Sequence, residues 1–191
     1  MISQSELNRK IETVLSCQAA VKPAIRPGVE SYLKIQDMYS RQAIDPDFQR
    51  LFRTFYRVRG TLNRDSLWDI LKKREEISIV AAMKALVSSK RPAVHLSFAS
   101  KALHTINPDL PIYDSTVRDF FGLSIPPPGL ALDKRLAFRE GVYNDLKGIY
   151  AGRDTNHLFR LAEAFDGLFP QYQETITEVK KIDFMIWGFG R

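Results

Sequence analysis

Helical periodicity runs through almost all of this chain and restricts the folds open to it. Apolar residues recur every three or four positions, as at Phe48, Phe52 and Phe55, and no pair of segments alternates as paired strands do. Asp45 and Pro46 begin that helix with a capping carboxylate and a proline at the first helical position. The 191 residues suffice for one sizeable core. The sequence therefore predicts an all-α fold of about eight to ten helices.

Prolines divide the predicted helices. Pro23 and Pro27 follow the first helix, over residues 4–20, and are expected to separate it from the second. Three consecutive prolines, Pro126–Pro128, cannot lie inside a helix, so this segment is expected to be a loop. We expect one compact helical unit over 1–191.

The charge of the chain favours an acidic partner. Its net charge is +6, which favours a polyanion without identifying one. Arg50, Arg53 and Arg57 lie at helical spacing on one face. That face is either simply solvated or in contact with phosphates.

Composition also bears on location and cofactors. No apolar run is long enough to span a bilayer, and the N-terminal residues lack the apolar region of a secretory signal. The single cysteine, Cys17, excludes an internal disulfide and a multi-cysteine metal site. His95, His104 and His157 lack metal-ligand spacing. We expect a cytoplasmic protein, nucleoid-associated if prokaryotic, with no cofactor, metal or membrane partner.

The stretch Ser97–Gly122, SFASKALHTINPDLPIYDSTVRDFFG, differs from the amphipathic helices around it. It predicts a short helix carrying Lys101, a proline-rich turn, and a second helix capped by Asp114. The other periodic segments are explained as core, so this stretch carries the candidate chemistry.

Two parts of this stretch resemble the helix-hairpin-helix DNA glycosylase superfamily. Phe98–Ala102 contains a lysine followed by a small residue in an apolar helix. Pro111–Arg118 contains a proline, apolar residues, an aspartate, small hydroxyl residues and a valine–x–arginine run. The resemblance implies an all-helical protein with two lobes flanking a cleft, here 30–125 as the hairpin lobe and 1–29 plus 126–191 as the other.

The resemblance also implies an activity, the hydrolysis of the N-glycosidic bond of a modified or damaged base. Asp114 would be the carboxylate that stabilises positive charge on the sugar or orients a water. Lys101 would be either an amine that attacks C1′ or an anchor for a phosphate. The partner would be double-stranded DNA with the target base flipped out of the stack.

Further residues are candidates for holding that DNA. The candidates for nucleic-acid contacts are Arg118, Lys90, Arg91, Ser97 and Ser100. The candidates for the base pocket are Tyr113, His104 and Trp187, with Phe189 as another stacking surface.

Simpler interpretations stay open for the same residues. Asp114 is also a good helix cap without any catalytic role. Lys101 is also a solvated or phosphate-touching lysine, and Trp187 is also a core residue. The alternative functions are a non-catalytic DNA-binding module on the same scaffold and a helical interaction protein with solvated arginines.

Overall fold

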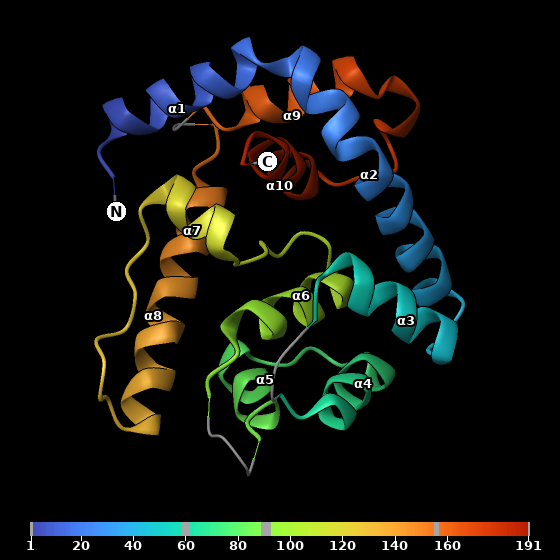
Figure 1. Ribbon diagram of the computed structural model, residues 1–191, viewed down its shortest axis with the longest axis vertical. Coiled ribbons are helices and arrows are strands. Elements are labelled where there is room, and N and C mark those ends of the chain that lie inside the picture. Colours follow the sequence, from blue (N-terminus) through green and yellow to red (C-terminus); the bar gives the residue numbers. More distant parts are fainter. Residues whose placement is uncertain (1, 59–61, 89–92, 155–156, 191) are drawn as a thin grey trace. The chain divides into compact units, whose positions relative to one another are not determined.

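Ten α-helices and one 3₁₀ turn occur among the described residues, with no β-strand, which confirms the all-α prediction. The computed structural model describes residues 2–58, 62–88, 93–154 and 157–190. No helix within those ranges is long and apolar enough to cross a membrane. The elements, drawn in Figure 1, are α1 (Gln4–Ser16), α2 (Gln18–Ser40), α3 (Pro46–Phe55), α4 (Arg64–Lys73), α5 (Ile79–Ala85), α6 (Leu96–Ile106), α7 (Ser115–Phe121), α8 (Leu132–Ala151), α9 (Phe159–Leu168), the 3₁₀ turn (Pro170–Tyr172) and α10 (Glu178–Phe189).

The chain divides into two compact units. Unit 1 comprises Met1–Pro27, Pro108–Ile125 and Asn144–Arg191, and unit 2 comprises Gly28–Asn107 and Pro126–Tyr143. The long helices α2 and α8 each contribute residues to both units. The two lobes expected from the resemblance, and the cleft that they would flank, stay predictions.

Helix α2 passes through both prolines that were expected to interrupt the chain. Pro23 and Pro27 lie inside this helix, so the predicted break is wrong. Val21, Ile25 and Val29 are all buried, which shows that an apolar face with helical spacing continues past both prolines. Burial of that face offsets the backbone hydrogen bonds that the prolines remove.

Helix α10 is the central element of unit 1. It packs against α9, α7 and α1, and Figure 1 shows it end-on beside α1 and α9. Every residue from Val179 to Ile186 is buried, so the helix is enclosed on all sides. This enclosure matters for the site, because it includes charged side chains as well as apolar ones.

Gly188 allows α10 to approach α2 closely. A Cβ atom at this position would lie 2.4 Å from a methyl carbon of Ile25 and 2.8 Å from one of Val21. We expect Gly188→Ala to lower the free energy of unfolding by about 1–3 kcal/mol, because both neighbours are buried. Urea unfolding measures the change.

The matched control for this prediction is Gly148→Ala in α8. A Cβ atom there would meet nothing within 4 Å, and the position is exposed. Alanine should therefore raise stability by up to about 1 kcal/mol through its helix propensity. Equal effects of the two substitutions would contradict the close packing at Gly188.

Unit 2 is built around aromatic side chains. The ring of Tyr32 lies 6.4 Å from that of Phe55 and 5.7 Å from that of His104. Phe52 meets Trp68 edge-on, with 5.7 Å between the ring centres. These contacts join α2, α3, α4 and α6, so His104 is a fully buried member of the core of this unit.

Candidate active site

Asp114 is the N-cap of α7, as predicted. Its Oδ1 accepts a hydrogen bond of 3.0 Å from the backbone N–H of Val117. Ile112 and Tyr113 immediately before it are only 2% and 4% exposed, so the backbone that carries Asp114 is anchored in the core of unit 1. Asp114 itself is partly exposed. Within the described part of the chain, Oδ2 makes no hydrogen bond, so this oxygen keeps its capacity to accept one.

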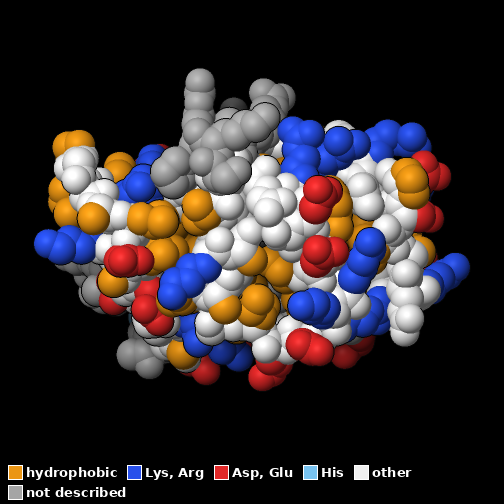
Figure 2. Space-filling model, turned by 90° about the horizontal axis from the view of Figure 1, so that it is seen from below, with side chains coloured by type: hydrophobic (Ala, Val, Ile, Leu, Met, Phe, Trp, Pro, Cys, Tyr) orange, Lys and Arg blue, Asp and Glu red, His pale blue; other side chains and the backbone are white. Residues whose placement is uncertain are grey.

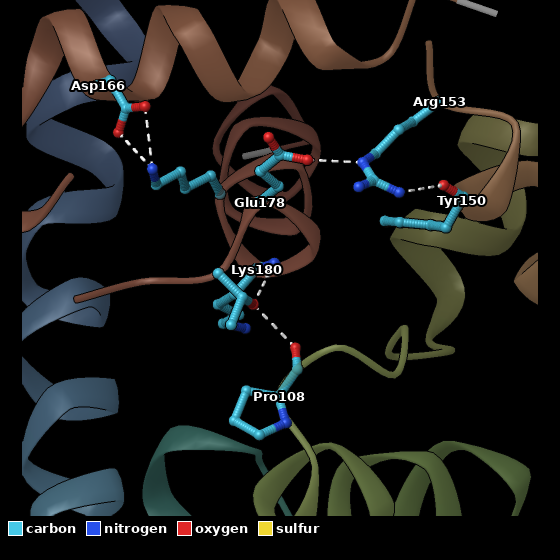
Figure 3. Close-up of polar contacts among 8 residues, drawn as sticks. Pro108, Tyr150, Arg153, Asp166, Glu178 and Lys180 are labelled. Carbon is cyan, nitrogen blue, oxygen red and sulfur yellow. Dashed lines mark hydrogen bonds and ion pairs between the residues drawn. The ribbon is translucent and has the colours of Figure 1, made fainter. Parts of the chain in front are cut away.

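The loop that leads to Asp114 is tied to the beginning of α10. Thr177 Oγ1 donates a hydrogen bond of 2.8 Å to the carbonyl oxygen of Pro108 and also accepts the Lys180 backbone N–H, at 3.4 Å. Figure 3 shows the contact at Pro108. One side chain therefore caps α10 and holds the start of the loop, which restricts the position of Asp114.

Tyr150 of α8 adds a buried hydroxyl to this region. Burial raises the pKa of Tyr150 well above its usual value, and the negative charges of Asp183 and Asp114 raise it further. Tyr150 therefore stays protonated at neutral pH. Among the described residues its hydroxyl has no hydrogen-bond partner. Its ring packs edge-on against Phe121 of α7 at 5.8 Å.

Two lysines and an aspartate of α10 are buried. Lys180 Nζ lies 2.5 Å from Asp183 Oδ2, and the two side chains are 3% and 8% exposed. Lys181 Nζ lies 2.7 Å from Asp166 Oδ1 and donates to the Gln173 carbonyl oxygen at 2.7 Å. Removing such charges from water is costly unless they are paired. The pairs therefore keep α10 in one register within unit 1.

These buried charges were missed by the sequence analysis. The segment EVKKIDFMIWGF has apolar residues on every face of the helix it forms. An α-helix with that pattern is enclosed, so Lys180, Lys181 and Asp183 within it must be buried and paired. The apolar residues on every face of this segment could therefore have predicted the buried charges.

An exposed ion pair joins the end of α8 to the first turn of α10. Arg153 Nε lies 2.6 Å from Glu178 Oε2, and the same guanidinium donates to the Tyr150 carbonyl oxygen at 3.4 Å (Figure 3). The two charged side chains are 34% and 54% exposed. Breaking an ion pair this exposed costs less stability than removing one partner of the buried pair at Asp183.

A pocket of about 290 Å³ lies beside α7 but on a different face from Asp114. Asp114 falls in line with Val117 and Phe121, whereas the pocket is lined from α7 by Ser115, Thr116, Asp119 and Phe120. Its other walls include Ile186 and Phe189, and Phe189 is 40% exposed. Tyr113 and Trp187 do not line this pocket, so we do not assign the pocket to the flipped base. The predicted role of Tyr113 and Trp187 in holding a base stays a prediction.

Lys101 is a buried residue of unit 2. Its side chain is 8% exposed, and Nζ donates to the Tyr56 carbonyl oxygen at 3.3 Å and to Ser97 Oγ at 3.0 Å. Ser100 Oγ donates to the Ser97 carbonyl oxygen at 3.1 Å. The predicted residues Ser97, Ser100 and Lys101 thus form one polar cluster in the first turns of α6. Lys101 belongs to unit 2 and Asp114 to unit 1, so their action at one site stays a prediction.

The candidate phosphate contacts differ in setting. Arg118 forms an ion pair of 2.7 Å with Asp119 and is 28% exposed. Lys90 and Arg91 lie outside the described residues. On the face drawn in Figure 2, lysine and arginine side chains are interspersed with acidic ones. A contact with DNA at Arg118 would have to compete with its bond to Asp119.

Residues 2–58, 62–88, 93–154 and 157–190 contain no group of three or more histidine, cysteine, aspartate or glutamate side chains that could hold a metal ion.

Comparisons of the chain with protein-family models, with curated proteins and with solved structures gave no match.

Proposed function

We propose that this chain is a DNA glycosylase-like protein of the helix-hairpin-helix kind. It would flip a modified or damaged base out of double-stranded DNA and hydrolyse the N-glycosidic bond. The observation that carries the proposal is the setting of Asp114. One carboxylate oxygen is fixed by the Val117 amide, while the other is available at a partly exposed position on an anchored loop.

The chemistry required of Asp114 fits this setting. Cleavage of the bond builds positive charge on the sugar, and a carboxylate held near C1′ stabilises that charge in the transition state. Because Oδ1 is held by its own helix, the Asp114 carboxylate needs little further ordering when DNA binds. The same carboxylate can orient the water that attacks C1′.

The contacts of Lys101 favour a structural role over attack on C1′. Its Nζ is bonded to the Tyr56 carbonyl oxygen and to Ser97 Oγ, and the side chain is buried. A nucleophilic amine would have to leave both partners and lose its proton. We therefore propose that Asp114 acts with water, without a covalent intermediate on Lys101.

Borohydride trapping tests this proposal for Lys101. We expect no covalent protein–DNA product when borohydride is added during the reaction of the wild-type protein, because no Schiff base forms. Lys101→Ala should lower the free energy of unfolding by about 1–3 kcal/mol through its lost buried hydrogen bonds. A trapped product that disappears in Lys101→Ala would contradict the structural role and identify Lys101 as the nucleophile.

A non-catalytic DNA-binding module is the second candidate function. It is favoured by the fact that capping α7 already accounts for one oxygen of Asp114. Both candidates predict duplex binding whose affinity falls steeply with salt, because net charge +6 favours contacts with phosphates. They are distinguished by base release from duplexes that carry modified bases, which only the glycosylase performs. A helical interaction protein would show no salt-dependent DNA binding.

A further inference from the structure

A second pocket, of about 440 Å³, lies in unit 2 between the α2–α3 turn and the C-terminal end of α4. The turn contributes Gln42, Ala43, Ile44 and Asp45 to its lining, and α4 contributes Lys72 with its C-cap Arg74. Two cations and one carboxylate therefore line the same pocket. The chemistry proposed for Asp114 makes no use of any of these residues.

Within the described residues, the guanidinium of Arg74 is held by an aromatic ring and has no acidic partner. Its Cζ lies 4.3 Å from the centre of the Tyr39 ring, a cation–π contact. Its Nη2 is buried and has no hydrogen-bond partner within the described residues. Buried donors are nearly always satisfied in folded proteins, so this guanidinium keeps hydrogen-bonding capacity that the described part of the protein does not use.

Asp45, the acidic residue that lines the pocket, does not neutralise the two cations. Asp45 lines the pocket, but no ion pair within 4.0 Å joins it to Lys72 or Arg74 among the described residues. Its Oδ1 instead accepts from the backbone N–H groups of Asp47 and Phe48, at 3.0 and 2.9 Å. The α3 N-terminus thus compensates part of the Asp45 charge, and the pocket has a net positive charge.

The backbone at this pocket is also unusual. Gln42 has φ +62° and Arg74 has φ +57°, both in the left-handed region that glycine adopts most easily. Glycine at Arg74 would relieve that strain but would remove the guanidinium. Arginine at this position combines a strained backbone with a guanidinium that lines the pocket.

We propose that this pocket binds a phosphate group through Arg74 and Lys72. A planar guanidinium supplies paired donors to phosphate oxygens, and a neighbouring ammonium adds charge. The phosphate is either part of a DNA backbone or carried by a free small molecule. The proposal does not depend on Asp114 being catalytic.

The first test uses inorganic phosphate as the probe, with chloride at the same pH and ionic strength as the reference. Phosphate should raise the melting temperature of the wild-type protein and give a saturable titration. Arg74→Gly should weaken phosphate binding at least about tenfold, because a charge-assisted donor is lost. It should also unfold no more readily than wild type, because glycine adopts φ +57° without strain.

Neighbouring lysines provide the matched control. Lys72 lines the pocket and Lys73 does not, although both are exposed near the end of α4. Lys72→Ala should weaken phosphate binding, while Lys73→Ala should leave it unchanged. Equal losses in the two variants would overturn the proposal, because they would reflect general charge rather than the pocket.

The second arm identifies the source of the phosphate. For duplex DNA, the slope of log affinity against log salt should be shallower by about 0.9 in Arg74→Gly if the pocket holds a backbone phosphate. An unchanged slope with a lost response to inorganic phosphate would assign the pocket to a free phosphorylated molecule. Unchanged behaviour of Arg74→Gly in both arms would overturn the proposal.

Discussion

Asp114→Asn is expected to reduce base release from a modified duplex by about 100- to 10,000-fold. The amide keeps the cap of α7, because asparagine and aspartate cap helices about equally well. It removes the negative charge that would stabilise the developing positive charge on the sugar. The free energy of unfolding should therefore change by less than about 1 kcal/mol, while single-turnover base release nearly stops.

The control for this substitution is Asp47→Asn. Asp47 lies in the first turn of α3 and is exposed, with an ion pair to Arg50 of 2.9 Å. The variant removes one negative charge from another helix N-terminus, so any effect of net charge alone appears in both proteins. Equal base release by wild type, Asp47→Asn and Asp114→Asn would show that Asp114 is a helix cap and nothing more.

Asp183→Asn is expected to have the largest effect on stability, a loss of about 3–5 kcal/mol in the free energy of unfolding. The substitution preserves the shape of the side chain but removes the charge that faces Lys180 Nζ at 2.5 Å. Both groups are almost fully buried, so the ammonium loses its counter-charge in a region that water does not reach. For a chain of this length the melting temperature should fall by about 10 °C.

Two comparisons isolate the cause of that loss. Glu178→Gln breaks the exposed ion pair with Arg153 in the first turn of α10 and should cost less than about 1 kcal/mol. The double variant Lys180→Met with Asp183→Leu removes both buried charges and should recover most of the stability. A small effect of Asp183→Asn, equal to that of Glu178→Gln, would contradict the assignment of a buried pair that stabilises α10.

Local signals in the sequence were enough to predict Asp114. A helix cap depends on the residue itself and on the amides that follow it within the next turn, so a proline-rich turn followed by Asp114 defines it. The all-α class was predictable for a similar reason, because an apolar face with helical spacing is read within a single segment. These features require no knowledge of which helices pack together.

Features that depend on packing were missed or predicted wrongly. Pro23 and Pro27 favour a break locally, but the buried face of α2 continues past them. Lys180 and Asp183 were missed although their segment is apolar on every face, because that pattern indicates burial only when it is read as a helix enclosed by other helices. Burial of the Tyr150 hydroxyl near the negative charges of Asp114 and Asp183 also depends on how the helices pack.

The settings of Lys101 and Arg74 also required the structure. Lys101 follows two serines in sequence, but its bond to the Tyr56 carbonyl oxygen joins residues far apart in the chain. The left-handed backbone of Arg74 cannot be predicted from the sequence, because glycine is the usual residue in that conformation. The stacking of Arg74 on Tyr39 joins α4 to α2, which a pattern within one helix cannot indicate.

Single-turnover base release tests the central claim most directly. The wild-type protein, in excess, is incubated with duplexes that each carry one modified or damaged base, beside an unmodified duplex. We predict release of the free base from at least one modified duplex, and loss of that release in Asp114→Asn despite unchanged duplex binding. Salt-dependent binding of every duplex, with no base released from any of them, would contradict the glycosylase and favour the non-catalytic DNA-binding module.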